Sequence, residues 1–299
     1  MGDATGDGDT LQRFLFEHAA IRGEVLRLDA GWRAVLETHD YPPVVRRMLG
    51  EALTAAVLLS STLKFNGSLT LQIQSDGPLH LLVAEATSDR TFRGMAQWRD
   101  QVPDGDLPAV FGSGRMVITL DPRDGGERYQ GVVALEGDSL AAAVENYLVR
   151  SEQLATRIWL AVDERRAAGL LLQRLPGDTP DEDVDAWERA GHLAATVRPE
   201  ELLDLDGAEL RHRLFHEEDL RVFEPEPVRF HCTCSRERVA RMLLGLGADE
   251  VRSIVADEGQ VEVHCEFCNR RYAFDPVDAE QLLADGGLEG FTGDPGTQH

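Results

Sequence analysis

The chain has no cysteine in its first 231 residues, and it has no long uninterrupted apolar run. The longest apolar region, Met48 to Leu63, contains Gly50 and Glu51. It stops short of the roughly 18 to 20 apolar residues that a bilayer helix needs. Residues 1–10 are acidic and glycine-rich, unlike a signal peptide. We therefore expect a cytoplasmic protein without a membrane partner.

Basic residues are scarce relative to acidic ones. The 30 Lys and Arg residues stand against 53 Asp and Glu residues, which gives a formal net charge of −23. Attraction to nucleic acid would need a local basic patch, and no such patch of useful length is present. The length of 299 residues and the 42% hydrophobic content fit one substantial core plus a smaller unit.

All four cysteines cluster near the carboxy-terminal end. Cys232 and Cys234 form a C-x-C pair, and after 30 intervening residues Cys265 and Cys268 form a C-x-x-C pair. Each pair can offer two sulfurs to one ion, so the pattern predicts a four-thiolate site that favours Zn²⁺ over an iron–sulfur centre. Ordinary buried thiols or permanent disulfides are the alternatives, and a reducing cytoplasm disfavours the disulfides.

The amino-terminal part reads as an α+β domain with a mainly antiparallel sheet. Residues 68–74 alternate strictly, with Leu69, Leu71 and Ile73 on one face, as in a half-buried strand. The turn at residues 75–78 then predicts a hairpin. Further strands are expected at residues 79–86, 91–96, 115–120, 129–135, 156–162 and 169–175, and short strands within residues 23–36.

Two helices are expected in this part. Proline at the first turn and an Ala/Leu-rich composition predict a mostly buried helix over Val44 to Leu63. A second helix is expected over Ser139 to Gln153. The Pro/Gly-rich stretch from Pro176 to Pro180 is the best domain boundary in the sequence.

An acidic segment follows this boundary. Residues 176–227 hold 16 acidic and 5 arginine residues, for a net charge of −11. Apolar residues such as Trp187, Leu210 and Phe215 nevertheless recur, which a disordered linker would lack. The segment can form amphipathic helices whose apolar faces need a partner, although a solvated helical spacer is the alternative.

The cysteine lobe combines short elements. Ser235 is a good N-cap for a helix over Arg236 to Leu246, and Asp275-Pro276 starts a last helix through Leu283. A short helix is expected at residues 249–256, with strands at 261–263 and 272–274. A lobe this small should depend on its metal.

Several stretches resemble the redox-regulated holdase chaperones of the 33 kDa chaperonin, or heat shock protein 33, family. The resemblance covers most of residues 10–285. Its carrying stretches are Leu49-Gly50-Glu51-Ala52, Thr62 to Gln74, Gly77-Pro78-Leu79, Glu145-Asn146-Tyr147, Ser151-Glu152-Gln153, Leu214 to Glu218 and the cysteine cluster.

The resemblance implies three functional regions and a tail. These are an α/β client-binding core at 10–178, a metastable acidic helical linker at 179–227, a zinc-binding redox switch at 228–285 and a flexible tail at 286–299. It also implies one Zn²⁺ per chain on Cys232, Cys234, Cys265 and Cys268. On oxidation, Cys232 would pair with Cys234 and Cys265 with Cys268.

The implied function is that of an ATP-independent chaperone that protects unfolding proteins from aggregation under oxidative stress. The reduced zinc form is expected to be inactive, and the active form to be a homodimer. A zinc-ribbon module in which the metal is only structural is the main alternative. A thiol–disulfide enzyme is a further alternative, because C-x-x-C is also a redox motif.

Other polar residues offer little chemistry. His231 and His264 flank the cysteines, but four sulfurs already fill a tetrahedral site, so exposed strand positions are expected for both. Glu51, Lys64 and Glu145 are candidates for acid–base chemistry, yet no nucleophile, phosphate loop or paired carboxylate motif accompanies them. The sequence therefore predicts no catalytic site and no enzyme.

Overall fold

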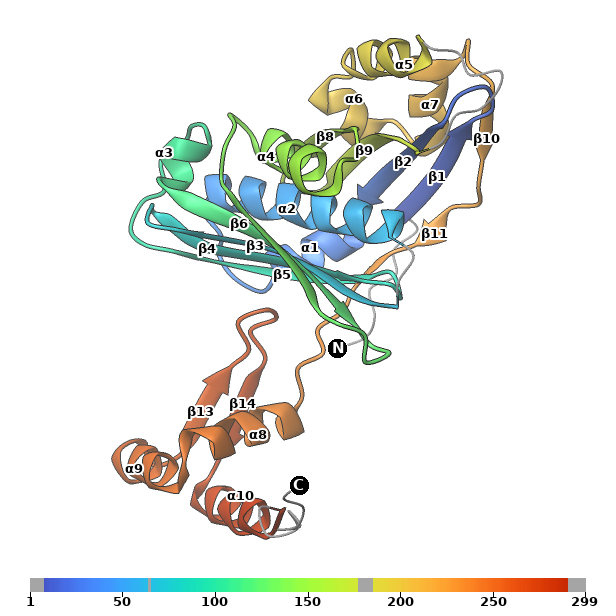
Figure 1. The fold of residues 1–299 in the computed structure, drawn as a ribbon. Helices are drawn as coiled ribbons and strands as arrows, with labels where there is room; N and C mark the ends of the chain where they lie inside the picture. Colours follow the sequence, from blue (N-terminus) through green and yellow to red (C-terminus); the bar gives the residue numbers. More distant parts are fainter. Residues whose placement is uncertain (1–7, 64–65, 177–184, 290–299) are drawn as a thin grey trace. The chain divides into compact units, whose positions relative to one another are not determined.

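The computed structural model describes residues 8–63, 66–176 and 185–289, with side chains through residue 284. The chain divides into two compact units that meet in sequence between His231 and Cys232 (Figure 1). In the described part of the chain, no helix is long and apolar enough to cross a membrane.

The first unit contains two sheets. One has the strand order β10-β1-β2-β9-β8, with β11 beside β1, and the other has the order β12-β5-β4-β3-β6-β7. All pairings are antiparallel except β12 with β5. The α+β class with a mainly antiparallel sheet is thus confirmed. The strands are β1 (Thr10–Phe16), β2 (Ile21–Leu28), β3 (Gly67–Ser75), β4 (Leu79–Thr87), β5 (Thr91–Trp98), β6 (Gly114–Pro122), β7 (Tyr129–Ala134), β8 (Thr156–Val162), β9 (Ala167–Arg174), β10 (Leu220–Val222), β11 (Glu226–Pro227) and β12 (Arg229–Phe230).

Helix α2 (Pro43–Thr62) lies between these sheets and packs on both (Figure 1). From Ala52 to Ser61 every residue of the helix is buried, which explains the absence of a polar face in its sequence. Side chains from α2 and both sheets form one continuous apolar core. The smaller helices α1 (Ala30–Leu36), α3 (Leu107–Phe111) and α4 (Leu140–Tyr147) complete the unit.

The acidic segment forms three helices that belong to the first unit: α5 (Ala186–Ala194), α6 (Pro199–Asp204) and α7 (Gly207–Phe215). Their apolar side chains pack against the face of β1, β2, β8 and β9 that points away from α2 (Figure 1). Phe215 contacts Phe14 and Phe16, with ring centroids 5.9 and 5.4 Å apart. The expected amphipathic helices therefore have a partner surface.

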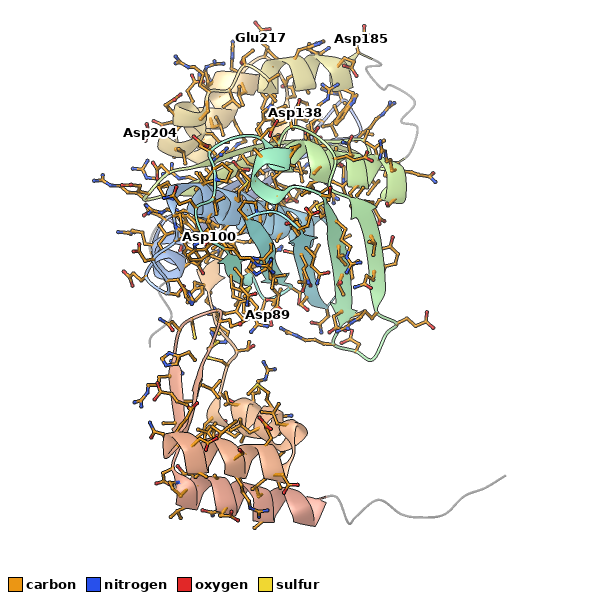
Figure 2. All side chains as sticks on the ribbon, turned by 90° about the vertical axis from the view of Figure 1, so that its left-hand side faces the viewer. Asp89, Asp100, Asp138, Asp185, Asp204 and Glu217 are labelled. Carbon is orange, nitrogen blue, oxygen red and sulfur yellow. The ribbon has the colours of Figure 1, made fainter. Side chains whose placement is uncertain are left out.

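The surface of the first unit carries acidic side chains on many sides. Asp89, Asp100, Asp138, Asp185, Asp204 and Glu217 are all exposed, and they lie in separate loops or at helix ends (Figure 2). Because these residues are negatively charged, the surface around them does not attract a polyanion such as nucleic acid.

The second unit is small. It consists of α8 (Arg236–Leu246), α9 (Ala248–Glu258), the hairpin of β13 (Val261–His264) and β14 (Arg271–Phe274), and α10 (Pro276–Glu289). Its buried hydrophobic core among the described residues is limited to Val239, Leu243, Val251, Val261, Tyr272, Phe274 and Ala279.

Three sequence expectations need correction. Val35 and Leu36 lie in α1 and not in a strand. The helix expected to reach Gln153 ends at Tyr147, and a π-helical turn over residues 148–152 follows it. The last helix continues to Glu289 and so includes residues 286–289, which were assigned to the tail. The expected boundary at 176–180 falls largely on residues 177–184, outside the described residues.

Candidate metal centre

Local structure holds each cysteine pair in place. Cys232 and Cys234 precede α8, whose N-cap Ser235 accepts a hydrogen bond from the Arg238 amide. Cys265 and Cys268 lie in the turn between β13 and β14. There the Cys265 amide donates to Arg270, and the Cys265 carbonyl accepts from Asn269. The start of α8 therefore positions Cys232 and Cys234, and the β13–β14 turn positions Cys265 and Cys268.

The four sulfur atoms converge. Those of Cys232 and Cys265 are 3.7 Å apart, those of Cys234 and Cys268 are 3.3 Å apart, and all four lie within 4.8 Å of one another. A tetrahedral zinc site with Zn–S bonds of about 2.3 Å has sulfurs about 3.8 Å apart. The donor set and its dimensions are thus compatible with a single metal ion, and no disulfide links the four thiols.

Tyr272 supports the cluster from β14. Its hydroxyl donates to the Cys234 sulfur over 3.1 Å. Burial by itself raises the pKa of the Cys234 thiol, but hydrogen bonds from Tyr272 and the neighbouring thiols outweigh it and lower that pKa. Burial raises the pKa of both Cys232 and Cys268. In the metal-free cluster, the Cys234 thiol therefore ionises more readily than a free cysteine.

The two flanking histidines do not belong to this cluster of described residues. The His264 ring bonds Glu262 at 2.9 Å and Asn269 at 3.2 Å, and the hydrogen bond with Glu262 raises the pKa of His264. His231 is exposed, and its backbone amide donates to the carbonyl of Phe92. Both are exposed, as expected, and His264 lies in a strand.

The acid–base candidates lie in the first unit. The Glu145 carboxylate on α4 accepts a hydrogen bond from the Ile158 amide at 2.6 Å, so it ties α4 to β8. Glu51 is half-buried on α2, and Lys64 is outside the described residues. The four cysteines are evident from their spacing in the sequence, whereas Tyr272 was expected only as a strand residue.

Comparisons with known proteins place the chain in a family. A family model described as Hsp33 protein matches residues 9–275. The 33 kDa chaperonin of Nitrosococcus oceani is 54% identical over 277 residues, which cover 93% of this chain and 95% of that protein. The 33 kDa chaperonin of Methylobacillus flagellatus is 49% identical over 276 residues, covering 92% and 94%.

A solved structure shows the same fold. The crystal structure of the 33 kDa chaperonin from Thermotoga maritima superimposes with a TM-score of 0.81 at 24% identity, covering 94% of this chain and 99% of that chain. The family match and the two curated relatives together show that the chain belongs to the Hsp33 family of 33 kDa chaperonins.

Proposed function

We propose that this chaperone is an ATP-independent holdase of the cytoplasm, without enzymatic activity, that the redox state of its cysteine cluster controls. In the reduced, zinc-bound form it is inactive. Oxidation to two disulfides releases the zinc and exposes surface that binds unfolding proteins. The observation that carries the proposal is the convergence of four sulfurs within 4.8 Å in a unit with little core of its own.

The proposed zinc ligands are Cys232, Cys234, Cys265 and Cys268. A bound Zn²⁺ would cross-link the start of α8 to the β13–β14 turn and keep the four sulfurs as thiolates. The Tyr272 hydroxyl orients one of these sulfurs by its hydrogen bond. The thiolates are also the groups that oxidants attack, so ligand and sensor are the same atoms.

The second unit depends on this cross-link in our proposal. Structural zinc contributes on the order of 10 to 16 kcal/mol in small peptide sites. A whole domain is stable by roughly 5 to 15 kcal/mol. The few buried side chains around Val251 and Phe274 cannot replace a contribution of that size, so loss of the cross-link unfolds the unit.

Oxidation forms one bond between the sulfurs of Cys232 and Cys234 and a second between those of Cys265 and Cys268. Each pair of thiolates gives up two electrons as its disulfide forms. One hydrogen peroxide molecule per disulfide accepts these electrons and, with two protons, leaves as two water molecules. A thiol reductant reverses the step, because the C-x-C disulfide closes a small ring and is expected to be easy to reduce.

The linker, residues 179–227, connects oxidation of the cysteines and unfolding of the second unit to client binding. Its helices α5 to α7 bury apolar side chains on the sheet of β1, β2, β8 and β9. Its net negative charge keeps it soluble once it is detached. When the helices leave, Phe14, Val25 and Leu170 on the sheet become available to unfolded proteins, and the active form assembles as a homodimer.

The test compares two forms of the full chain. The zinc-bound reduced protein and the same protein after peroxide at mildly raised temperature are assayed for zinc release, for suppression of client aggregation and for mass by light scattering. We expect release of one zinc, gain of aggregation suppression and a dimeric mass, all reversed by a thiol reductant. Equal activity of the reduced zinc form would exclude the switch.

A further inference from the structure

Glu51 on α2 has no role in the proposed switch. In the described part of the chain, no hydrogen bond or ion pair engages its carboxylate. The nearby cation Arg47 instead pairs with Asp104 at 3.0 Å. Burial raises the pKa of Glu51 to about 7, and the charge of Arg47 only partly offsets this effect. A half-buried carboxylate without a partner costs free energy unless water or a ligand satisfies it.

Glu51 lines a cavity of about 270 Å³ in the first unit, and this cavity is partly open to solvent. Core elements supply part of the wall, including Trp159 and Leu160 on β8. The linker supplies the opposite part with Val197, Arg198 and Leu202. Most of the wall is apolar, so the cavity combines one acidic group with a surface that suits a short hydrocarbon chain.

Arg198, the cationic linker residue at the cavity, does not neutralise Glu51. The Arg198 side chain is 74% exposed and lies 3.6 Å from the Glu201 carboxylate, so its charge already has a partner. Glu51 and Arg198 are the charged residues that line the cavity. Beside them, Arg47 acts on Glu51, Glu201 pairs with Arg198, and the Glu145 carboxylate accepts a hydrogen bond from the amide of the lining residue Ile158. The acidic group therefore remains the one cavity-lining charge among the described residues that lacks a partner.

We propose that this cavity binds a small organic cation, namely a free primary ammonium ion on a short aliphatic chain. The ammonium group would donate to the Glu51 carboxylate, and the chain would contact Trp159 and Leu202. An anion would be repelled, and a neutral analogue would leave the carboxylate without a partner. A divalent metal would need more oxygen ligands than one carboxylate provides.

Binding of the ammonium ion in this cavity would stabilise the docked linker. This consequence rests on the proposed function. The cavity is complete only while α6 is docked, because Leu202 and the residues before it form one wall. A ligand that binds the docked form alone favours it by the factor 1 + [L]/Kd. At ten times its Kd, an alkylammonium ion would shift the equilibrium between docked and detached linker about elevenfold toward docking.

The test uses the full-length, zinc-loaded, reduced chain and n-butylammonium as the probe, titrated by NMR or calorimetry at pH 8. We expect saturable binding, with 1-butanol and butyrate at least tenfold weaker. Binding should weaken as the pH falls from 8 to 6, because protonation of Glu51 removes the negative charge. These comparisons use the unmodified protein and do not depend on how a variant folds.

Two variants complete the test. Glu51→Gln should weaken n-butylammonium binding at least tenfold, whereas Glu200→Gln, at an exposed site on α6, should leave it unchanged. Equal binding of n-butylammonium and 1-butanol, or unchanged binding to Glu51→Gln, would refute the site. Since binding is measured without a client protein, failure of the proposed switch would leave this readout intact.

Discussion

The hydroxyl of Tyr272 donates a hydrogen bond to the sulfur of Cys234, across 38 residues of sequence. The Tyr272 ring is buried in the small core of the second unit, so the hydroxyl is held in position by the packing of its own side chain. Burial and this hydrogen bond raise the pKa of Tyr272 to about 12, which keeps it a donor.

Replacing Tyr272 by Phe should therefore weaken metal binding. Loss of a partner that orients a ligand typically costs roughly 10- to 100-fold in metal affinity. We expect zinc transfer to a chromogenic chelator to become faster by about tenfold or more. Tyr129→Phe, which removes a hydroxyl bonded to Glu152 in the first unit, is the matched control. Unchanged transfer from Tyr272→Phe would show that the hydroxyl does not stabilise the bound metal.

Removing the metal under reducing conditions should unfold the second unit alone. Helices α8, α9 and α10 should then lose their circular dichroism signal and become accessible to protease, because the core around Leu243 and Val251 is small. All four tryptophans lie in the first unit, so tryptophan fluorescence provides an internal control and should change little. A chelated protein that keeps its helicity would contradict metal-dependent folding of this unit.

Much of the fold could be predicted from local patterns. The alternation of Leu69, Leu71 and Ile73 predicted β3 because one face of that strand is buried and the other is not. Val35 and Leu36 were misassigned because α1 has only seven residues, too few to show a helical period. Trp32 and Val35 are both buried on one side of that helix, which local pattern alone did not reveal.

The site was predictable only in part. Cysteine spacing identified the four sulfurs, since ligand pairs close in sequence are a local signal. The contact of Tyr272 depends on the register of β13 and β14, in which Tyr272 lies opposite Val263. The lack of a partner for the Glu51 carboxylate likewise depends on which residues of β8 and the linker line the cavity beside it. Such contacts between distant segments have no signature in a single sequence.

Phe215 should control the docking of the linker. Its ring is buried against Phe14 and Phe16, and truncating such a ring to Ala costs about 3 to 5 kcal/mol. We expect Phe215→Ala to make the linker protease-sensitive while zinc is bound. The variant should then suppress client aggregation without peroxide. Phe223→Ala, at a ring that is 40% exposed, is the control and should remain inactive when reduced. A protease-sensitive but inactive Phe215→Ala would separate linker release from client binding.

Glu24 should make the stability of the first unit depend on pH. Its side chain is buried on β2 with one oxygen bonded to Ser61 and the other, Oε1, without a partner among the described residues. Burial raises the pKa of Glu24 from the usual 4.5 to about 7, an effect that Ser61 and nearby arginines only partly offset. The folded state therefore binds the proton more tightly than the unfolded state. The stability due to this proton is fully present below about pH 4.5 and is lost as the pH rises through 7.

Glu24→Gln should remove this dependence. In urea unfolding followed by tryptophan fluorescence, the free energy of unfolding of the original chain relative to the variant should fall by about 3 kcal/mol between pH 4.5 and pH 8. Comparing the two chains cancels the contribution of Glu51, whose pKa is also raised to about 7 by burial. Glu200→Gln, at an exposed position on α6, serves as the control and should give a constant difference. A constant difference for Glu24→Gln as well would mean that Glu24 titrates alike in the folded and unfolded chains.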